Sequence, residues 1–311
     1  MATLPLAKDT SGVRAHRLGN RDWQLGYLLI LPAALVIVGL IAYPFIYSIW
    51  MSLQIIHVGG AGKFVWFQNY GNLLFGVYQA RFWNSVLVTV EYTVSAEVGK
   101  FLIGVITALI LHNSLKARGL FRALLFVPWA VPAVVSAYTW RWMFDDRLGL
   151  WNSLLTNAGL IHMPILFLSS LDLALWSVVA ATIWQGTPFW TMTYLAGLQS
   201  IPFEIYEAAH IDGANAWHSF WRITMPNLMP VIIVTFMLSS IWTSNNLQYV
   251  YILTNGGPVN ATETFPLLAY ILGMRDYNLG LAAAVPLLFF PVFAVMIYAL
   301  SGRLLHEEAA T

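Results

Sequence analysis

Six long apolar segments constrain this chain more than any other feature of its sequence. Each is long enough to cross the roughly 30 Å hydrocarbon core of a bilayer as a helix that rises about 1.5 Å per residue. The segments are Leu25–Leu53, Phe82–His112, Phe121–Phe144, Leu171–Leu195, Asn227–Leu253 and Leu279–Leu304. Of the 311 residues, 59% are hydrophobic and only 9% are charged, a composition far outside that of soluble domains. We predict an all-α polytopic membrane protein with six transmembrane helices.

These segments divide the chain into three parts. The polar residues 1–24 precede the first segment, and no small-residue cleavage site follows that segment, so we interpret it as an uncleaved span and not a signal peptide. Residues 25–304 are expected to form the six-helix transmembrane domain, and residues 305–311 a short tail. No soluble domain, linker or internal repeat is evident.

Lysine and arginine are distributed unevenly between the two sides of the predicted membrane. Nine fall on the side of the termini: Lys8, Arg14, Arg17, Arg21, Lys116, Arg118, Arg122, Arg222 and Arg303. Five fall on the other side: Lys63, Arg81, Arg141, Arg147 and Arg275. Because positive residues concentrate on the cytoplasmic side, both termini are expected there. The net charge is only +1, and the positively charged residues are scattered over helix ends instead of gathered on one face, which argues against a nucleic-acid partner.

A polar hairpin, residues 196–226, connects the fourth and fifth segments on the expected cytoplasmic side. Pro202 to Ile211 has apolar residues at helical spacing, and Gly213 is placed to end that helix. Ala216 to Ile223 repeats the pattern, and Pro226 fixes the first turn of the next span. We expect two short helices that meet near a right angle.

The spacing in this hairpin resembles the signature of binding-protein-dependent ABC importer permeases. That signature is Glu-Ala-Ala, three residues, Gly, nine residues, Ile, one residue and Leu-Pro. Its counterparts here are Glu207, Ala208, Ala209, Gly213, Ile223 and Pro226, with Met225 in place of the leucine. Trp184 to Pro188, Asp212 to Ala214 and Thr254 to Pro258 resemble the carbohydrate branch, the maltose-type first permease subunit. The resemblance implies that the hairpin, including Asp212, is the coupling helix that sits in a cleft of an ATPase subunit.

The resemblance also implies the partners. They are a second, similar permease, two copies of an ATPase and an extracytoplasmic solute-binding protein, assembled in the inner membrane of a prokaryote. No helix start in this chain carries a Gly-rich phosphate loop, so ATP and Mg are expected on the separate ATPase and no cofactor on this chain. The chain has no Cys, and His210 and His218 have no third ligand at helical spacing, so neither a metal site nor a catalytic site is expected.

Polar residues within the fourth and fifth segments are expected to face a wet pathway, because lipid-facing polar groups are costly. Hydrogen bonding between helices is the other explanation. Amides, hydroxyls and aromatic rings without Arg or Lys suit a neutral sugar better than an anion. By resemblance, the sugar-contacting positions are Gly186, Phe189, Trp242, Thr243 and Asn246, to which we add Gln185. Helical spacing puts Trp242, Thr243 and Asn246 on one side of the fifth segment, with Gly186 and Phe189 opposite.

The second segment holds Glu91, Glu97 and Lys100. Glu97 and Lys100 are three residues apart, so they can neutralise each other on one helix face. If this pair relays protons or ions, the chain is a secondary transporter. The alternative is that the two charges neutralise each other and have only a structural role. Glycerol 3-phosphate or a polyol on the same machinery is a second alternative, and a membrane-embedded enzyme is a third. The preferred interpretation is a permease subunit that translocates a sugar or small oligosaccharide by alternating access.

Overall fold

The computed structural model describes residues 22–57, 59–113 and 116–308. These residues are almost entirely helical, which confirms the all-α class. Strand structure in these ranges is limited to the antiparallel pair β1 (Gln54–Ile55) and β2 (Lys63–Phe64) and one isolated bridge. The expected N-terminal segment lies outside the described residues up to residue 21, and the expected tail lies outside them from residue 309. The chain separates into two compact units, Met1–Trp50 and Met51–Thr311.

The described residues of the first unit form a single apolar helical rod. It contains α1 (Asp22–Ile37), the π-helical turn η1 (Val38–Ala42) and most of α2 (Tyr43–Ser52). In η1 the backbone N–H of Tyr43 donates to the carbonyl of Val38, five residues back. The next residue, Pro44, has no N–H to continue the regular ladder, which accounts for the wider turn at this point.

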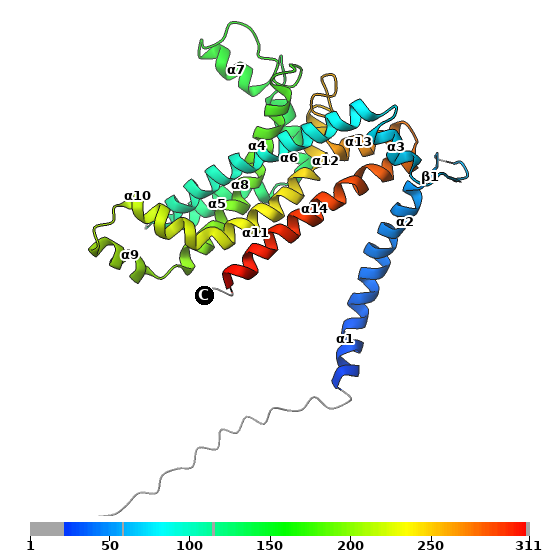
Figure 1. The fold of residues 1–311 in the computed structure, drawn as a ribbon. Coiled ribbons are helices and arrows are strands. Elements are labelled where there is room, and N and C mark those ends of the chain that lie inside the picture. The colour runs from blue at the N-terminus through cyan, green and yellow to red at the C-terminus, as the bar shows by residue number, and fades with distance from the viewer. Residues whose placement is uncertain (1–21, 58, 114–115, 309–311) are drawn as a thin grey trace, which may run out of the picture. The chain divides into compact units, whose positions relative to one another are not determined.

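The second unit contains the remaining helices. They are α3 (Gln68–Leu74), α4 (Gln79–His112), α5 (Arg118–Ala130), α6 (Ala133–Met143), α7 (Leu150–Asn157), α8 (Ala174–Ser200), α9 (Phe203–Ile211), α10 (Ala216–Ser219), η2 (Phe220–Thr224), α11 (Met225–Ser244), α12 (Leu247–Leu253), α13 (Phe265–Tyr270), η3 (Ile271–Arg275) and α14 (Leu279–Glu308). Helices α4, α8 and α11 pack on one another, and α14 packs on α11 (Figure 1). Helices α9 and α10 lie at the end of this bundle where α14 finishes, far from α3 (Figure 1).

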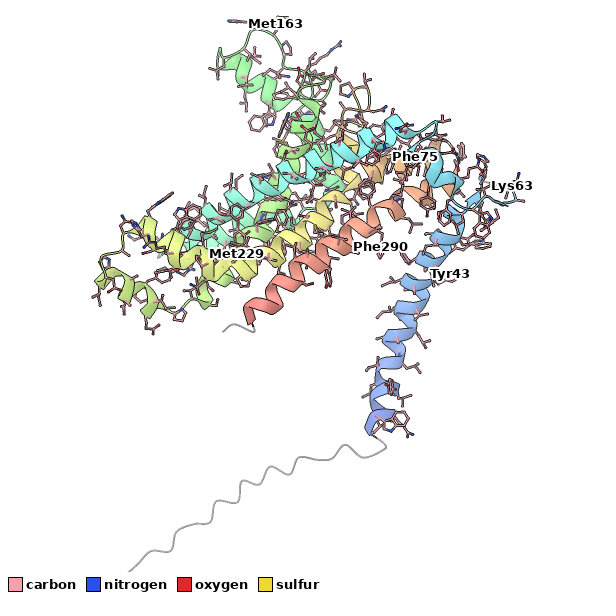
Figure 2. The ribbon with its side chains drawn as sticks, viewed as in Figure 1. Tyr43, Lys63, Phe75, Met163, Met229 and Phe290 are labelled. Carbon is pink, nitrogen blue, oxygen red and sulfur yellow. The ribbon has the colours of Figure 1, made fainter. Side chains whose placement is uncertain are left out.

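Four helical stretches of the described chain are long and apolar enough to cross a membrane, and five if one bent pair counts as a span. The four are Trp23–Ser52, Gln79–His112, Ala216–Ser244 and Leu279–Gly302. The expected count of six is therefore not reproduced. Helix α8 has 27 residues, enough to span, but it is not among these four stretches. Outward apolar side chains such as Met229 on α11 and Phe290 on α14 give the bundle a lipid-compatible surface (Figure 2).

The expected third span is broken. Helices α5 and α6 meet at 92° instead of forming one rod. Pro132 stands at the N-cap of α6, and the residue before it, Val131, has extended backbone angles. Because a proline disfavours helical backbone in the residue before it, the apolar segment turns here. Two short helices, α3 and α7, lie in the connections between longer helices.

Small residues bring α4 and α8 close together. A Cβ on Gly104 of α4 would lie 2.7 Å from the Cβ of Trp190 on α8. Trp190 is fully buried and packs in a cluster with Leu195, Leu198 and Leu228. Glycine at such a crossing lets two helix backbones approach, as is common between membrane helices.

Candidate functional site

A cavity of about 160 Å³ lies between α4, α8 and α11. It is lined by Lys100, Trp129, Thr182, Gln185, Gly186, Phe189, Ser239, Trp242, Thr243 and Asn246. All six residues that the sequence singled out as substrate-binding candidates are therefore brought to one place. The substrate-binding candidates did not include the other four lining residues, although Thr182 and Ser239 belong to the polar residues of the fourth and fifth segments that were expected to face the pathway. For Lys100 a signal existed, because a lysine inside an apolar helix seldom faces lipid.

Asn246 lines this cavity from the connection between α11 and α12, and not from the helix face on which we expected it. Helix α11 ends at Ser244, and Asn246 has extended backbone angles, so it does not share a helix face with Trp242. Its side-chain oxygen instead caps α12 by accepting from the N–H of Tyr249 at 3.2 Å. The helical spacing argument was wrong here because asparagine competes for backbone hydrogen bonds and favours cap positions. The amide NH₂ of Asn246 is not needed for the cap.

Two aromatic rings close one side of the cavity. The ring centroids of Phe189 and Trp242 lie 5.1 Å apart in an edge-to-face arrangement. We expected these residues to face each other across the substrate, but they touch. The Trp242 side chain is 55% exposed in this chain, so one of its faces is open to a ligand or to another subunit.

Lys100, which forms another part of the wall, belongs to a buried ion pair. The ammonium of Lys100 donates to Glu97 Oε1 at 2.6 Å, which confirms the pairing expected from the three-residue spacing. Lys100 is 2% exposed and Glu97 is fully buried. Our expectation that no lysine or arginine reaches the candidate site was wrong, because α4 carries Lys100 to the cavity from a segment we had treated separately.

Two hydroxyls of α11 complete this network. Lys100 also donates to Ser239 Oγ at 2.9 Å and to Thr243 Oγ1 at 2.6 Å. Both hydroxyls donate onward to Glu97 Oε1, Ser239 at 3.1 Å and Thr243 at 2.7 Å. The indole N–H of Trp190 donates to Ser239 Oγ at 2.9 Å. Thr243 thus lines the cavity with its hydroxyl proton already committed to Glu97.

The hairpin candidates lie at the far end of the second unit. Glu207, Ala208 and Ala209 belong to α9, which follows Pro202 as expected and ends at Ile211 with Asp212 as its C-cap. Gly213 has φ +82°, a left-handed conformation that L side chains rarely adopt. A Cβ there would meet no atom within 4 Å, so the constraint at Gly213 comes from its backbone conformation and not from crowding.

The second half of the hairpin is not a separate helix. From Ala216 the chain runs through α10, η2 and α11 as one helical stretch to Ser244, which corrects the expected pair of short helices. Asn215 caps its start by accepting from the N–H of His218 at 2.9 Å. In η2 the N–H of Met225 donates to the carbonyl of Phe220. The π turn lets the helix continue through Pro226, which has no N–H to donate.

Much of the hairpin surface is open in this chain. Glu207 is exposed, and so are the apolar side chains of Ile211, at 86%, and Trp217, at 68%. Asp212, Gly213 and Ile223 line a cavity of about 380 Å³ with Arg222 and His218. Tyr206 Oη and Thr224 Oγ1 lie 3.0 Å apart and tie α9 to the helix that follows. Among the described residues, no group of three His, Asp or Glu side chains could hold a metal ion.

Comparisons with known proteins agree with these features. Residues 100–307 match the family model described as a binding-protein-dependent transport system inner membrane component. The chain is 37% identical over 290 residues to the trehalose/maltose transport system permease protein MalF of Thermococcus litoralis, covering 92% of this chain and 96% of that protein. It is 31% identical over 285 residues to the diacetylchitobiose uptake system permease protein DasB of Streptomyces coelicolor, with coverages of 90% and 86%.

A solved structure shares the fold. A bacterial ABC transporter involved in the import of the acidic polysaccharide alginate superposes with a TM-score of 0.76 over 91% of this chain and 95% of the matched chain, at 21% identity. The family match and the MalF identity settle membership. The chain belongs to the family of binding-protein-dependent transport system inner membrane components, and it is a membrane-embedded permease subunit of an ABC importer, not an enzyme.

Proposed function

We propose that this permease carries a neutral sugar or small oligosaccharide across the inner membrane of a prokaryotic cell. The observation that carries the proposal is the cavity beside Lys100, where amide, hydroxyl and aromatic groups converge. Lys100 is the one cation among the described lining residues, and Glu97 neutralises it. Sugar hydroxyls pair with such amides and hydroxyls, and the apolar faces of pyranose rings lie against Trp and Phe. The names of the relatives, trehalose/maltose and diacetylchitobiose permeases, support the same ligand class.

A second permease completes the site. The cavity of about 160 Å³ is smaller than the roughly 300 Å³ at which ligand pockets begin, so this chain supplies only part of a binding surface. The open face of Trp242 lies where the second subunit adds the remainder. Substrate contact is assigned to Gln185, Gly186, Phe189, Trp242, Thr243 and Asn246.

Coupling to ATP is assigned to the hairpin. Glu207, Ala208, Ala209, Asp212, Gly213, Ile223 and Pro226 bind a cleft of the ATPase subunit, whose two copies hold ATP and Mg. An extracytoplasmic solute-binding protein delivers the sugar, a partner supported by the alginate transporter solved with its periplasmic protein. When ATP closes the ATPase pair, the hairpins move together and the cavity changes its side of access.

The test is uptake into proteoliposomes that contain the full complex. Trehalose, maltose and glycerol 3-phosphate are offered with the cognate solute-binding protein, with and without ATP and with a proton ionophore. We expect ATP-dependent uptake of a neutral sugar that the ionophore leaves unchanged. Uptake that needs no ATP and collapses with the ionophore would overturn the proposal. Preference for glycerol 3-phosphate would overturn the substrate class alone.

Orientation has its own test, because the chain contains no Cys. A cysteine at Leu160, 71% exposed after α7, is expected to react with a membrane-impermeant thiol reagent in intact cells. A cysteine at Ile211 in the hairpin is expected to react only after the cells are opened. The reverse pattern would contradict cytoplasmic termini and a cytoplasmic hairpin.

A further inference from the structure

The ammonium of Lys100 is fully occupied. It has three N–H donors, and they are matched by Glu97 Oε1, Ser239 Oγ and Thr243 Oγ1 at 2.6, 2.9 and 2.6 Å. Lys100 is therefore part of the cavity wall without an N–H to offer a ligand. Its contribution to the cavity is its charge.

Glu97 neutralises the charge of Lys100 from a position that does not line the cavity. Its carboxylate is fully buried, and it is absent from the residues that line the cavity. Oε1 accepts all three hydrogen bonds of the network, and Oε2 has no hydrogen-bond partner among the described residues. Of the described residues lining the cavity, Lys100 is the charged one. The electrostatic balance at this wall therefore depends on one carboxylate that a ligand does not touch.

The hydroxyls are oriented by the same pair. Ser239 Oγ accepts from Lys100 and Trp190 and donates to Glu97, so its hydrogen-bonding capacity is used. Thr243 Oγ1 accepts from Lys100 and donates to Glu97, which leaves one lone pair. Toward the cavity Thr243 is an acceptor, so it suits a ligand that donates a hydroxyl proton, which a neutral sugar does and a carboxylate does not.

We propose that Glu97 is a specificity-determining residue that acts through Lys100: it cancels the charge of the cavity wall and orients Thr243, so that the site takes neutral hydroxylated ligands and rejects anionic ones. This inference rests on the proposed sugar-import function. Without Glu97 the ammonium would face the cavity uncompensated, in surroundings where a unit charge acts more strongly than in water. The cavity would then attract acidic sugars.

The experiment compares ligands that differ in charge. Equilibrium binding of a labelled neutral disaccharide and of a disaccharide with one uronic acid is measured on the full complex in nanodiscs, without the solute-binding protein. The variants are Glu97→Gln and the double variant Glu97→Gln with Lys100→Met, which removes both charges. We expect Glu97→Gln to shift the ratio of affinities toward the acidic sugar by about 10-fold or more, and the double variant to restore the wild-type ratio.

A purely structural pair predicts something else. Glu97→Gln would then weaken both ligands by the same factor, and an unchanged ratio overturns the proposal. A double variant that keeps the ratio of the single variant also overturns it, because Lys100 would not carry the effect. If wild type binds no neutral disaccharide at all, the proposed function fails instead.

A second variant keeps the test valid if Glu97→Gln does not assemble. Lys100→Met leaves the carboxylate without its cation, so the expected shift has the opposite sign. The probe is a disaccharide with one amino sugar, and its affinity relative to the neutral sugar should rise by about 10-fold. An unchanged ratio for this cationic probe overturns the proposal.

Discussion

Gly186 of α8 and Lys100 of α4 are in direct contact: a Cβ on Gly186 would lie 2.5 Å from Cδ of Lys100. The lysine stem passes the glycine on its way to Glu97, and its far end is held by three hydrogen bonds. The stem therefore has little freedom to yield. A residue we had singled out as a sugar contact also makes room for the ion pair.

Gly186→Ala is expected to destabilise the complex by about 1–3 kcal/mol, the usual cost of overpacking, and to weaken sugar binding. Thermal unfolding of the purified complex and ligand binding measure the two effects. The matched control is Gly119→Ala on α5, where an added Cβ meets no atom within 4 Å. Equal behaviour of the two variants would show that the Lys100 stem moves aside freely.

Gly213→Ala is expected to cost about 1–2 kcal/mol, because φ is +82° and an L side chain is strained there. Gly213→Asn should be milder, since asparagine tolerates this conformation, and Gly213→Val should be worst. ATP-dependent uptake and the ATPase rate together report coupling. A Cβ at this position meets no atom of this chain within 4 Å. If the Asn variant loses as much activity as the Val variant, side-chain size and not backbone strain causes the loss, and a partner surface must lie against this position.

Glu207→Ala is expected to uncouple ATP hydrolysis from uptake. A charge-assisted hydrogen bond to the ATPase is worth about 1.5–3 kcal/mol, so the affinity of the hairpin for that subunit should fall roughly 10- to 150-fold. Pull-down of the ATPase measures the loss of affinity, and ATP-dependent uptake measures the loss of coupling. Glu204→Ala is the control, because Glu204 is also exposed on α9. The assignment fails if both variants transport normally.

Asn246→Ala is expected to raise the apparent transport constant by roughly 5- to 150-fold, equivalent to about 1–3 kcal/mol for an unpaired sugar hydroxyl. Alanine also removes the cap of α12, so Asn246→Ser is needed beside it. Serine can accept the Tyr249 N–H but offers no amide NH₂. If substrate contact matters, Ser should resemble Ala in uptake while matching wild type in thermal stability. If the Ser variant matches wild type in both uptake and thermal stability while the Ala variant loses both, Asn246 acts as a helix cap and not as a sugar contact.

Arg81→Ala is expected to destabilise the second unit by about 3 kcal/mol, the lower end of the cost of breaking a buried pair. Glu263 is 1% exposed and accepts from Arg81 Nε and Nη2, both at 2.8 Å. The lower figure applies because the Arg81 side chain is 29% exposed. Arg147→Ala, at an exposed position, is the control. Thermal unfolding of the complex decides the matter, and equal midpoints for both variants would contradict it.

Features that depend on nearby residues were predictable from the sequence. The apolar lengths of α4 and α14, helix α9 after Pro202 and the pairing of Glu97 with Lys100 all follow from local spacing. Such features need only the 3.6-residue helical period, side-chain hydropathy and proline geometry. The family signature in the hairpin added the functional class, because its residues stand at fixed offsets along the chain.

Other features were decided only by packing between segments far apart in sequence. Lys100 became part of the candidate site because α4 packs against α8 and places the Lys100 side chain beside Gly186, and local spacing carries no information about that packing. Where local signals compete, tertiary context also decided the outcome. Asn246 lies beyond the end of α11 and caps α12, whereas the helix that begins at Ala216 continues past Pro226. An asparagine or a proline can serve either arrangement at similar local cost, and only the contacts of the folded bundle distinguish them.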